Sequence, residues 1–280
     1  MEQSRRPSRR FETVAAESGQ RPLLPCERRA ILLALMDASG SHSANRQYYD
    51  SFSQRYEQHR GQNNPGGYHE LLDELEAGFV ERFGVGREIL EIGCGTGLVL
   101  SRIATFARKA NGVDLSPGML QKARDRGLAV VEGSAADLPF DDASFDVTCA
   151  FKVLAHVPNI ERALSEMARV TRAGGTLIAE YYNPYSMRGL IRRIAPPRTV
   201  ASNAHEGDVY TRFDSPSRAR ALTPAGCQYH SSRGVRIVTP TAFAMRLPII
   251  RRCLWFAEHH LCDSPLRAFG GFYIAAYRKL

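Results

Sequence analysis

Apolar positions from residue 88 onward come in short runs, and amphipathic stretches separate the runs. The runs predict strands, and the stretches, with apolar residues three and four positions apart, predict helices. The predicted strands are residues 88–92, 110–115, 128–133, 145–151 and 175–182, and the helices between them are residues 98–109, 117–127 and 160–172. Alternation of this kind is typical of a parallel sheet that helices cover on both faces. Such sheets bind ligands at the carboxyl ends of their strands.

The segments that flank this region are less regular. An amphipathic helix is predicted over residues 69–82, where Leu71, Leu75 and Phe79 share one face. Residues 1–44 are polar and rich in arginine, and we expect a flexible arm with one short helix over residues 28–38.

The last third of the chain predicts a second group of elements. Residues 227–238 and 272–277 have the pattern of strands, and residues 249–261 have that of a helix. The two strands would form a C-terminal antiparallel hairpin at one edge of the sheet. Residues 185–226 lack a regular pattern, so we interpret them as a lid or insertion on the substrate side. The prediction is therefore one α/β domain over residues 45–280, with a mostly parallel seven-stranded sheet.

Charge is distributed unevenly along the chain. The net charge is +8, and residues 185–280 hold 15 Lys/Arg against 5 Asp/Glu. This basic third could contact an anionic substrate or a membrane surface, or it could reflect an arginine-biased composition. Nucleic acid is the least favoured partner, because no reader motif is present. No apolar run is long enough for a membrane span and no secretory signal is evident, so we expect a cytoplasmic protein.

The strongest local signal is the sequence E-I-G-C-G-T-G at residues 91–97. It joins a predicted strand to a predicted helix, where glycines allow a sharp turn and a close approach of the backbone to a ligand. A dinucleotide fingerprint would need Gly or Ala where Leu98 stands, and a P-loop would need a following Gly-Lys-Ser/Thr. Both alternatives are therefore disfavoured.

The glycine loop resembles that of class I S-adenosylmethionine-dependent methyltransferases, and further motifs extend the resemblance. They are V-D-L-S at residues 113–116, L-P-F-D-D-A-S-F-D at 138–146, L-A-H-V at 154–157 and V-T-R-A-G-G at 170–175. In this order they are similar to the ubiquinone- and menaquinone-methyltransferase branch, also called methyltransferase type 11. The resemblance covers about residues 45–184. It implies a Rossmann-like fold and S-adenosyl-L-methionine as cofactor.

The resemblance also implies roles for individual residues. Backbone groups of the glycine loop would face the methionyl part of the cofactor, Asp114 would bind both ribose hydroxyls, and Leu115 and Met119 would pack on the adenine. The family often has Asp where Ser134 stands, and a hydroxyl can still accept the bond from the adenine amino group. The complete set of predicted cofactor-binding residues is Glu91, Gly93, Cys94, Gly95, Gly97, Asp114, Leu115, Met119, Ser134, Ala135 and Phe151.

Two residues are candidates for catalysis. His156, in the L-A-H-V turn, could act as a base or orient the substrate, or it could only brace the site. Tyr49 belongs to the segment around Tyr48 and Tyr56 that closes over the cofactor in the branch, so one of these tyrosines could reach the sulfonium or the substrate. Lys152 and Tyr181 are further pocket candidates from their position alone.

These features favour methyl transfer by in-line displacement to an O, N or C centre of a small, anionic or apolar metabolite. The alternative is a non-catalytic protein of the same fold that binds the cofactor or acts as a scaffold. The helix over residues 249–261 carries Arg251 and Arg252 beside Trp255 and could touch a membrane, although covering the sheet is the favoured role. The sequence predicts no metal site, and its six scattered cysteines are expected to be free thiols.

Overall fold

A computed structural model describes most of the chain from Tyr68 onward. The described residues are 67–186 and 211–280, the single residues Asp50, Ser53, Tyr56, Glu57 and Arg60, and the backbone of residues 199–201 and 204–205. They belong to one compact unit, Ser43–Leu280. The helix predicted over residues 28–38 and the catalytic candidate Tyr49 lie outside the described residues.

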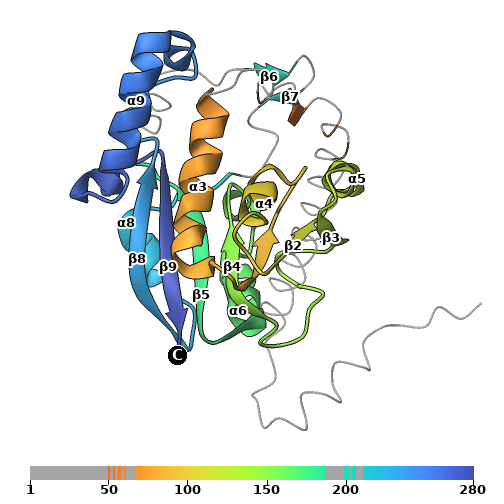
Figure 1. The fold of residues 1–280 in the computed structure, drawn as a ribbon. Helices are drawn as coiled ribbons and strands as arrows, with labels where there is room; N and C mark the ends of the chain where they lie inside the picture. Colours follow the sequence, from red (N-terminus) through yellow and green to blue (C-terminus); the bar gives the residue numbers. More distant parts are fainter. Residues whose placement is uncertain are drawn as a thin grey trace, which may run out of the picture. The chain divides into compact units, whose positions relative to one another are not determined.

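The centre of the fold is a seven-stranded sheet in the order β3-β2-β1-β4-β5-β9-β8 (Figure 1). Its strands are β1 (Glu88–Ile92), β2 (Lys109–Asp114), β3 (Ala129–Glu132), β4 (Phe145–Ala150), β5 (Thr171–Tyr182), β8 (Cys227–Val235) and β9 (Phe272–Lys279). The first five strands pair in parallel, and β9 runs antiparallel to both β5 and β8. The structure therefore confirms the mostly parallel sheet with its C-terminal antiparallel hairpin.

Helices cover both faces of this sheet (Figure 1). One face carries α3 (Tyr68–Gly84), α4 (Leu98–Ile103), α5 (Pro117–Asp125) and α9 (Pro248–Leu261), and the other carries α6 (Ile160–Val170) and α8 (Pro216–Ala221). Short 3₁₀ turns form at η1 (Leu154–His156), η2 (Ala244–Arg246) and η3 (Pro265–Phe269), and β6 (Thr199–Ala201) pairs with β7 (Ala204–His205). No helix among the described residues has both the length and the apolar character needed to cross a bilayer.

Alternation along β5 divides its side chains between two cores. Leu177, Ala179 and Tyr181 join the core under α6 and α8, whereas Ile178 joins the core under α3. Successive side chains of a strand point to opposite faces, so Glu180 and Tyr182 share the face of Ile178. This register decides which of the residues at the end of β5 can reach a site on the α3 side.

The first helix after the glycine loop is shorter than predicted. It ends at Ile103, where the N–H groups of Thr105 and Phe106 bond to the carbonyls of Arg102 and Ile103 in a tighter turn. Lys109, which the pattern assigned to the helix, instead begins β2 and pairs with Glu88. Strand pairing outweighs the helical pattern at this junction.

Candidate active site

The glycine loop turns sharply where β1 ends. Gly93 and Gly95 both have left-handed backbone angles, with φ of 71° and 54°. A Cβ atom at Gly93 would lie 2.6 Å from the Cβ of Val153, whereas one at Gly95 would enter open space. Glycine is thus required at Gly93 by packing, and at Gly95 the bare backbone faces a cavity.

Backbone and side-chain bonds hold this loop against the end of β2. The N–H groups of Gly93 and Cys94 both donate to the carbonyl of Val113, at 2.7 and 3.1 Å. The Cys94 thiol packs with Leu100 and Leu120, and burial raises its pKa far above the usual value. The backbone N–H and carbonyl of Cys94 therefore hold the loop, since the carbonyl accepts the N–H of Gly97 at 2.9 Å, and its thiol is a core group.

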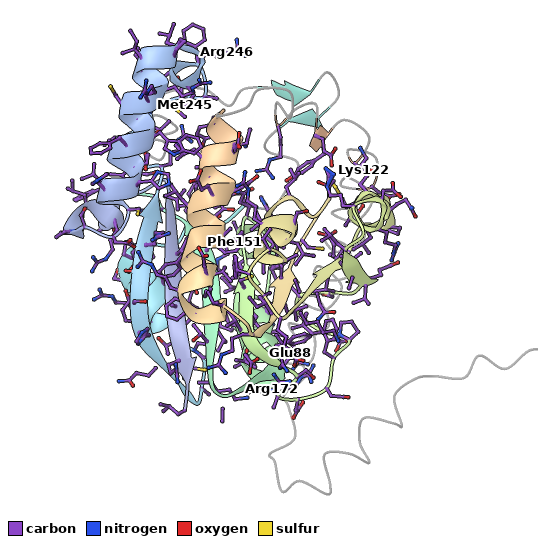
Figure 2. The ribbon with its side chains drawn as sticks, in the orientation of Figure 1. Glu88, Lys122, Phe151, Arg172, Met245 and Arg246 are labelled. Carbon is purple, nitrogen blue, oxygen red and sulfur yellow. The ribbon has the colours of Figure 1, made fainter. Side chains whose placement is uncertain are left out.

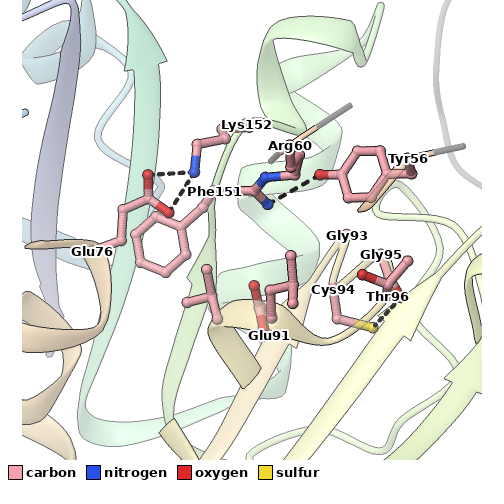
Figure 3. A pocket seen from close by; sticks show the side chains of 12 residues that line it. Tyr56, Arg60, Glu76, Glu91, Gly93, Cys94, Gly95, Thr96, Phe151 and Lys152 are labelled. Atoms are coloured by element: carbon pink, nitrogen blue, oxygen red, sulfur yellow. Dashed lines mark hydrogen bonds and ion pairs between the residues drawn. The ribbon is translucent and has the colours of Figure 1, made fainter. Parts of the chain in front are cut away.

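A pocket opens beside the loop, at the carboxyl ends of β1 and β4 (Figure 3). The pocket and its open mouth together enclose about 340 Å³ of space not filled by protein atoms. Its lining consists of Tyr56, Arg60, Glu76, Glu91, Gly93, Cys94, Gly95, Thr96, Leu98, Val99, Phe151 and Lys152. Of the predicted cofactor-binding residues, Glu91, Gly93, Cys94, Gly95 and Phe151 are thus gathered around one cavity.

Two polar groups in this lining lack a protein partner. The Oε2 atom of Glu91 and the hydroxyl of Thr96 are buried without a hydrogen-bond partner among the residues that the structure describes. Burial, together with the nearby carboxyls of Glu76 and Asp73, raises the pKa of Glu91 well above its ordinary range. A cationic donor in the pocket would satisfy this carboxyl, so the site fits a ligand with an ammonium group.

An ion-pair network forms one wall of the pocket (Figure 3). The ammonium group of Lys152 lies 2.6 Å from Oε1 of Glu76 and 3.4 Å from Oδ1 of Asp73. Arg60 reaches the same Asp73 oxygen at 2.6 Å and donates to the hydroxyl of Tyr56 at 3.2 Å. Three segments distant in sequence therefore meet in one charged cluster.

The pKa directions in this cluster follow from burial and charge. Burial raises the pKa of Glu76, and the neighbouring Lys152 only partly offsets it. For Asp73, burial acts in the same direction, but Lys152 and Arg60 outweigh it and lower the pKa. Burial and the charge of Glu76 raise the pKa of Glu180, which accepts the Lys152 backbone N–H at 3.1 Å.

Lys152 itself has an unusual backbone. Its φ of 59° places a non-glycine residue in the left-handed region, where an L side chain is strained. Strain of this kind persists where surrounding contacts fix the conformation, often at functional sites. Here those contacts are the ion pair to Glu76 and the bond to Glu180.

Asp114 connects the glycine loop to α5. Its two carboxylate oxygens accept the N–H groups of Gly95 and Ser116, each at 2.9 Å. Ser116 caps the helix by accepting from Met119, while Asp50 accepts the N–H of Gly118 at 2.8 Å. Asp114 is thus not the helix cap, and its remaining lone pairs can accept ribose hydroxyls.

The other predicted cofactor residues lie outside the pocket lining. Leu115 is half-buried and Met119 is buried at the start of α5. Ser134 accepts the N–H of Ala136, and Ala135 belongs to the core. Their contacts with adenine stay predictions.

The catalytic candidate His156 lies at the carboxyl end of β4, in η1. Its ring packs edge-on against Tyr182, with 5.8 Å between centroids, and its Nδ1 lies 3.4 Å from the hydroxyl of Thr211. Tyr182 also contacts Phe213 edge-on, at 6.0 Å. His156 is not part of the pocket lining described above, so its role stays a prediction.

Of the two weaker pocket candidates, Lys152 lines the cavity and Tyr181 does not. Tyr181 is buried on the opposite face, with its hydroxyl 2.9 Å from that of Tyr277. The assignment of Tyr181 was wrong because β5 alternates, and Tyr182 occupies the pocket-side face instead. Tyr56 lines the pocket, while Tyr48 and Tyr49 lie outside the described residues.

Several site residues were not predicted from the sequence. They are Arg60, Asp73, Glu76, Thr96 and Glu180. Glu180 carried a usable signal, since it is a carboxylate within an apolar strand. Glu76 gave no such signal, because an acid on an amphipathic helix usually faces solvent.

Comparison with known families gives an independent result. A family model described as a methyltransferase domain matches residues 90–179. A demethylmenaquinone methyltransferase of Mycobacterium sp. (strain JLS) is 38% identical over an alignment of 136 residues, and the match covers 43% of this chain and 56% of that protein. A sterol 4-C-methyltransferase of Caenorhabditis elegans is 31% identical over an alignment of 119 residues, and the match covers 39% of this chain and 36% of that protein. The chain thus spans about half the length, or less, of these curated relatives.

Solved structures share the fold of most of this chain. An S-adenosylmethionine-dependent methyltransferase of Thermotoga maritima aligns with a TM-score of 0.58 and 22% identity, over 83% of this chain and 98% of that one. The [4+2]-cyclase SpnF aligns with the same score and identity, over 85% of this chain and 96% of that one. At this identity the alignments establish the fold, and the glycine loop, the acid of β2 and the matched domain add the sequence evidence. Residues 90–179 of this chain therefore match a methyltransferase domain, and the chain has the fold of solved S-adenosylmethionine-dependent methyltransferases.

Proposed function

We propose that this chain transfers a methyl group from S-adenosylmethionine to a small molecule with an apolar ring system. The observation that carries the proposal is that Oε2 of Glu91, beside the open backbone of Gly95, has no hydrogen-bond partner within the described part of the chain. A buried carboxyl without a partner is costly, and it persists where a ligand supplies the missing donor. The methionyl ammonium group of the cofactor is a donor of this kind.

Different residues of the chain would bind different parts of the cofactor. Glu91 and the loop backbone at Gly93 and Gly95 would hold the methionyl end, and Asp114 would accept the ribose hydroxyls. Leu115 and Met119 would cover the adenine, with Ser134 and Ala135 at its edge. When bound, S-adenosylmethionine supplies an electrophilic methyl group on a sulfonium. The protein then has to hold an acceptor in line with that group.

The acceptor side is inferred from the ends of β4 and β5. His156, Tyr182 and Phe213 form a chain of edge-on ring contacts there. Aromatic edges and faces suit an apolar ring, and His156 could remove a proton from the acceptor or orient it. The two curated relatives are named for demethylmenaquinone and sterol acceptors, which supports an apolar ring compound as substrate. The acceptor centre, whether O, N or C, is left to the assay.

Calorimetric titration with S-adenosylmethionine and S-adenosylhomocysteine tests the first half of this proposal. We expect micromolar binding by the wild type, and binding about tenfold to a hundredfold weaker in Asp114→Ala. Transfer of a labelled methyl group to quinol, sterol and polar phenol acceptors then tests the second half. Absence of binding by a folded protein would overturn the proposal as a whole. Binding with transfer only to polar acceptors would overturn the substrate class alone.

His156 is tested in the same assay by His156→Gln. If His156 acts on the acceptor, turnover falls and the pH profile changes, while cofactor affinity stays the same. Unchanged turnover with an unchanged pH profile would remove the catalytic role and leave a bracing role for the ring.

A second candidate function follows from the similarity to a cyclase. SpnF, a [4+2]-cyclase, shares the fold over most of both chains, so this fold does not by itself fix methyl transfer. Cofactor binding without transfer to any acceptor would favour a cofactor-binding protein with another reaction, or a scaffold.

A further inference from the structure

A group of large apolar side chains is exposed around the start of α9. Its members and their exposed fractions are Phe243 (66%), Leu247 (47%), Ile249 (80%), Ile250 (42%) and Phe256 (66%). Single exposed apolar residues are common on protein surfaces, but five within residues 243–256 form a group that needs an explanation. We refer to these five side chains, together with Arg246, Arg251 and Arg252 beside them, as the α9 tip.

Helical geometry brings part of this group onto one stripe. Ile249, Cys253 and Phe256 follow one another at spacings of four and three residues, so they share one face of the helix. Arg252, which is exposed, stands three residues after Ile249 and four before Phe256, and therefore borders the same face. The outward face of the α9 tip is thus apolar with a basic border.

The α9 tip has charge of one sign within its own stretch of sequence. It carries Arg246, Arg251 and Arg252, and no Asp or Glu occurs in the sequence between Asp214 and Glu258. The guanidinium of Arg246 lies 5.8 Å from the centre of the Phe243 ring. The first turn of α9 also contains no acid, so the positive end of the helix dipole adds to these charges.

The other end of α9 is fixed to the domain. The buried carboxylate of Glu258 accepts the N–H groups of Ile237, Val238 and Thr239, each at 2.9 Å, and the Thr239 hydroxyl at 2.8 Å. Trp255 packs against the core under α3. The helix is therefore anchored near its C-terminal end, and Met245 is buried just before its start, while the apolar side chains named above are displayed.

The N-terminal end of α9 lies toward the same end of the sheet as the pocket, which is the end where the parallel strands finish. Arg246 lies next to the N-terminal end of α9, whereas Glu88 and Arg172 lie at the opposite end of the sheet, where β1 and β5 begin (Figure 2). The pocket opens at the carboxyl ends of β1 and β4. A flat surface that met the α9 tip would therefore approach the domain from its pocket side.

We propose that the α9 tip docks the protein onto a lipid bilayer that carries anionic headgroups. Its apolar side chains would enter the boundary between headgroups and acyl chains, and its arginines would pair with lipid phosphates and carboxylates. The uniform positive charge favours an anionic bilayer over a second copy of the chain, because a symmetric contact would bring like charges together. This inference concerns the surface, so it does not require the proposed methyl transfer.

Sedimentation with vesicles tests the proposal. We expect the wild type to sediment with vesicles of phosphatidylcholine and phosphatidylglycerol at low salt. Binding should be weaker at high salt or with phosphatidylcholine alone, since surface charge attraction is screened. Ile249→Glu should lower the partition coefficient about tenfold or more, because it places an acid in the apolar face. Arg252→Glu should lower it by less and should reduce the salt dependence.

Two substitutions elsewhere serve as matched controls. Val85 is 64% exposed and follows α3 at the opposite end of the sheet, and Arg278 is exposed near the C-terminus. Val85→Glu and Arg278→Glu should leave vesicle binding unchanged. Thermal unfolding and titration with S-adenosylmethionine of each variant show that the fold and the cofactor site are intact, whatever the vesicle result.

Three outcomes would overturn the inference. They are failure of the wild type to sediment with anionic vesicles, an equal loss of binding in Val85→Glu, and a concentration-dependent dimer that Ile249→Glu converts to a monomer. The last result, measured by analytical ultracentrifugation, would assign the α9 tip to a second copy of the chain.

Discussion

The carboxylate of Asp114 accepts the backbone N–H of Gly95 at 2.9 Å, so the end of β2 holds the loop that follows β1. One side chain thus fixes the loop and remains able to accept further hydrogen bonds. The residue predicted to recognise the cofactor also shapes the backbone that would face it.

This relationship makes Asp114 sensitive to substitution. Asp114→Ala removes a charge-assisted acceptor and a loop contact, and we expect S-adenosylmethionine affinity to fall about tenfold to a hundredfold. Calorimetric titration measures the change. Asp125→Ala, at the other end of α5, is the control and should bind as the wild type does. Equal affinity of Asp114→Ala and the wild type would contradict the ribose role.

Glu91→Gln should raise the stability of the ligand-free protein and weaken its binding of S-adenosylmethionine. Burial raises the folded-state pKa of Glu91 above its unfolded value, so the ligand-free protein loses stability as pH rises from about 4.3 toward the folded pKa. Glutamine carries no proton to lose, so the variant should gain in Tm relative to the wild type between pH 5 and pH 8. Its affinity for S-adenosylmethionine should fall about tenfold, because a neutral amide replaces the carboxylate.

Thermal unfolding across that pH range and calorimetric titration measure the two effects. Glu81→Gln, on the exposed side of α3, is the matched control and should change neither quantity. A Glu91→Gln protein whose Tm difference from the wild type does not vary with pH would contradict the burial argument.

Removal of the Lys152 charge should destabilise the fold. Lys152→Met leaves the fully buried Glu76 without its cation, which typically costs about 3–5 kcal/mol. The loss should grow as pH rises, since Glu76 can then no longer stay protonated. Glu76→Gln in the same chain should restore part of the stability, because it removes the unpaired carboxylate.

Denaturant unfolding of the two single variants and the double variant gives the coupling between these residues. Lys122→Met on α5 is a control for the loss of one lysine. Additive effects of the two substitutions would show that Lys152 and Glu76 do not stabilise each other.

Glu258→Gln should weaken the attachment of α9. Its carboxylate accepts three backbone N–H groups and a hydroxyl, and an amide cannot accept from all four donors. We expect a loss of about 2–4 kcal/mol in the free energy of unfolding, with faster hydrogen exchange at Ile237, Val238 and Thr239. Glu74→Gln, which affects only the half-exposed pair with His259, should cost less than about 1 kcal/mol. Unchanged exchange at the three amides would contradict the anchoring role.

The chain's pattern was sufficient to predict the architecture. Short apolar runs and amphipathic stretches alternate from Glu88 to Tyr182, and the two periods of 2.0 and 3.6 residues are local properties of the backbone. The glycine loop could be located for the same reason, since the turn after Ile92 needs glycine wherever the rest of the chain lies. The ends of elements were less accurate, as at α4, because strand pairing decides them.

The charged cluster in the pocket wall could be identified only from the tertiary structure. Asp73 and Glu76 follow a helical pattern that normally faces solvent, and only the packing of α3 over the ends of β1 and β4 brings them to Lys152. Likewise, the choice between Tyr181 and Tyr182 depended on the register of β5 against its neighbours. Residues on both faces of β5 are buried, so the strand shows no alternation of apolar and polar residues that would assign Tyr181 and Tyr182 to a face.

The sequence by itself therefore determined the fold class, the glycine loop and the acid that follows β2, since each rests on local periodicity or on a backbone requirement. The tertiary structure decided which buried charges compensate one another, which carboxyl is left for a ligand and which apolar side chains at α9 are displayed. Those properties depend on distances between side chains that are far apart in the chain, and only the packed domain fixes such distances.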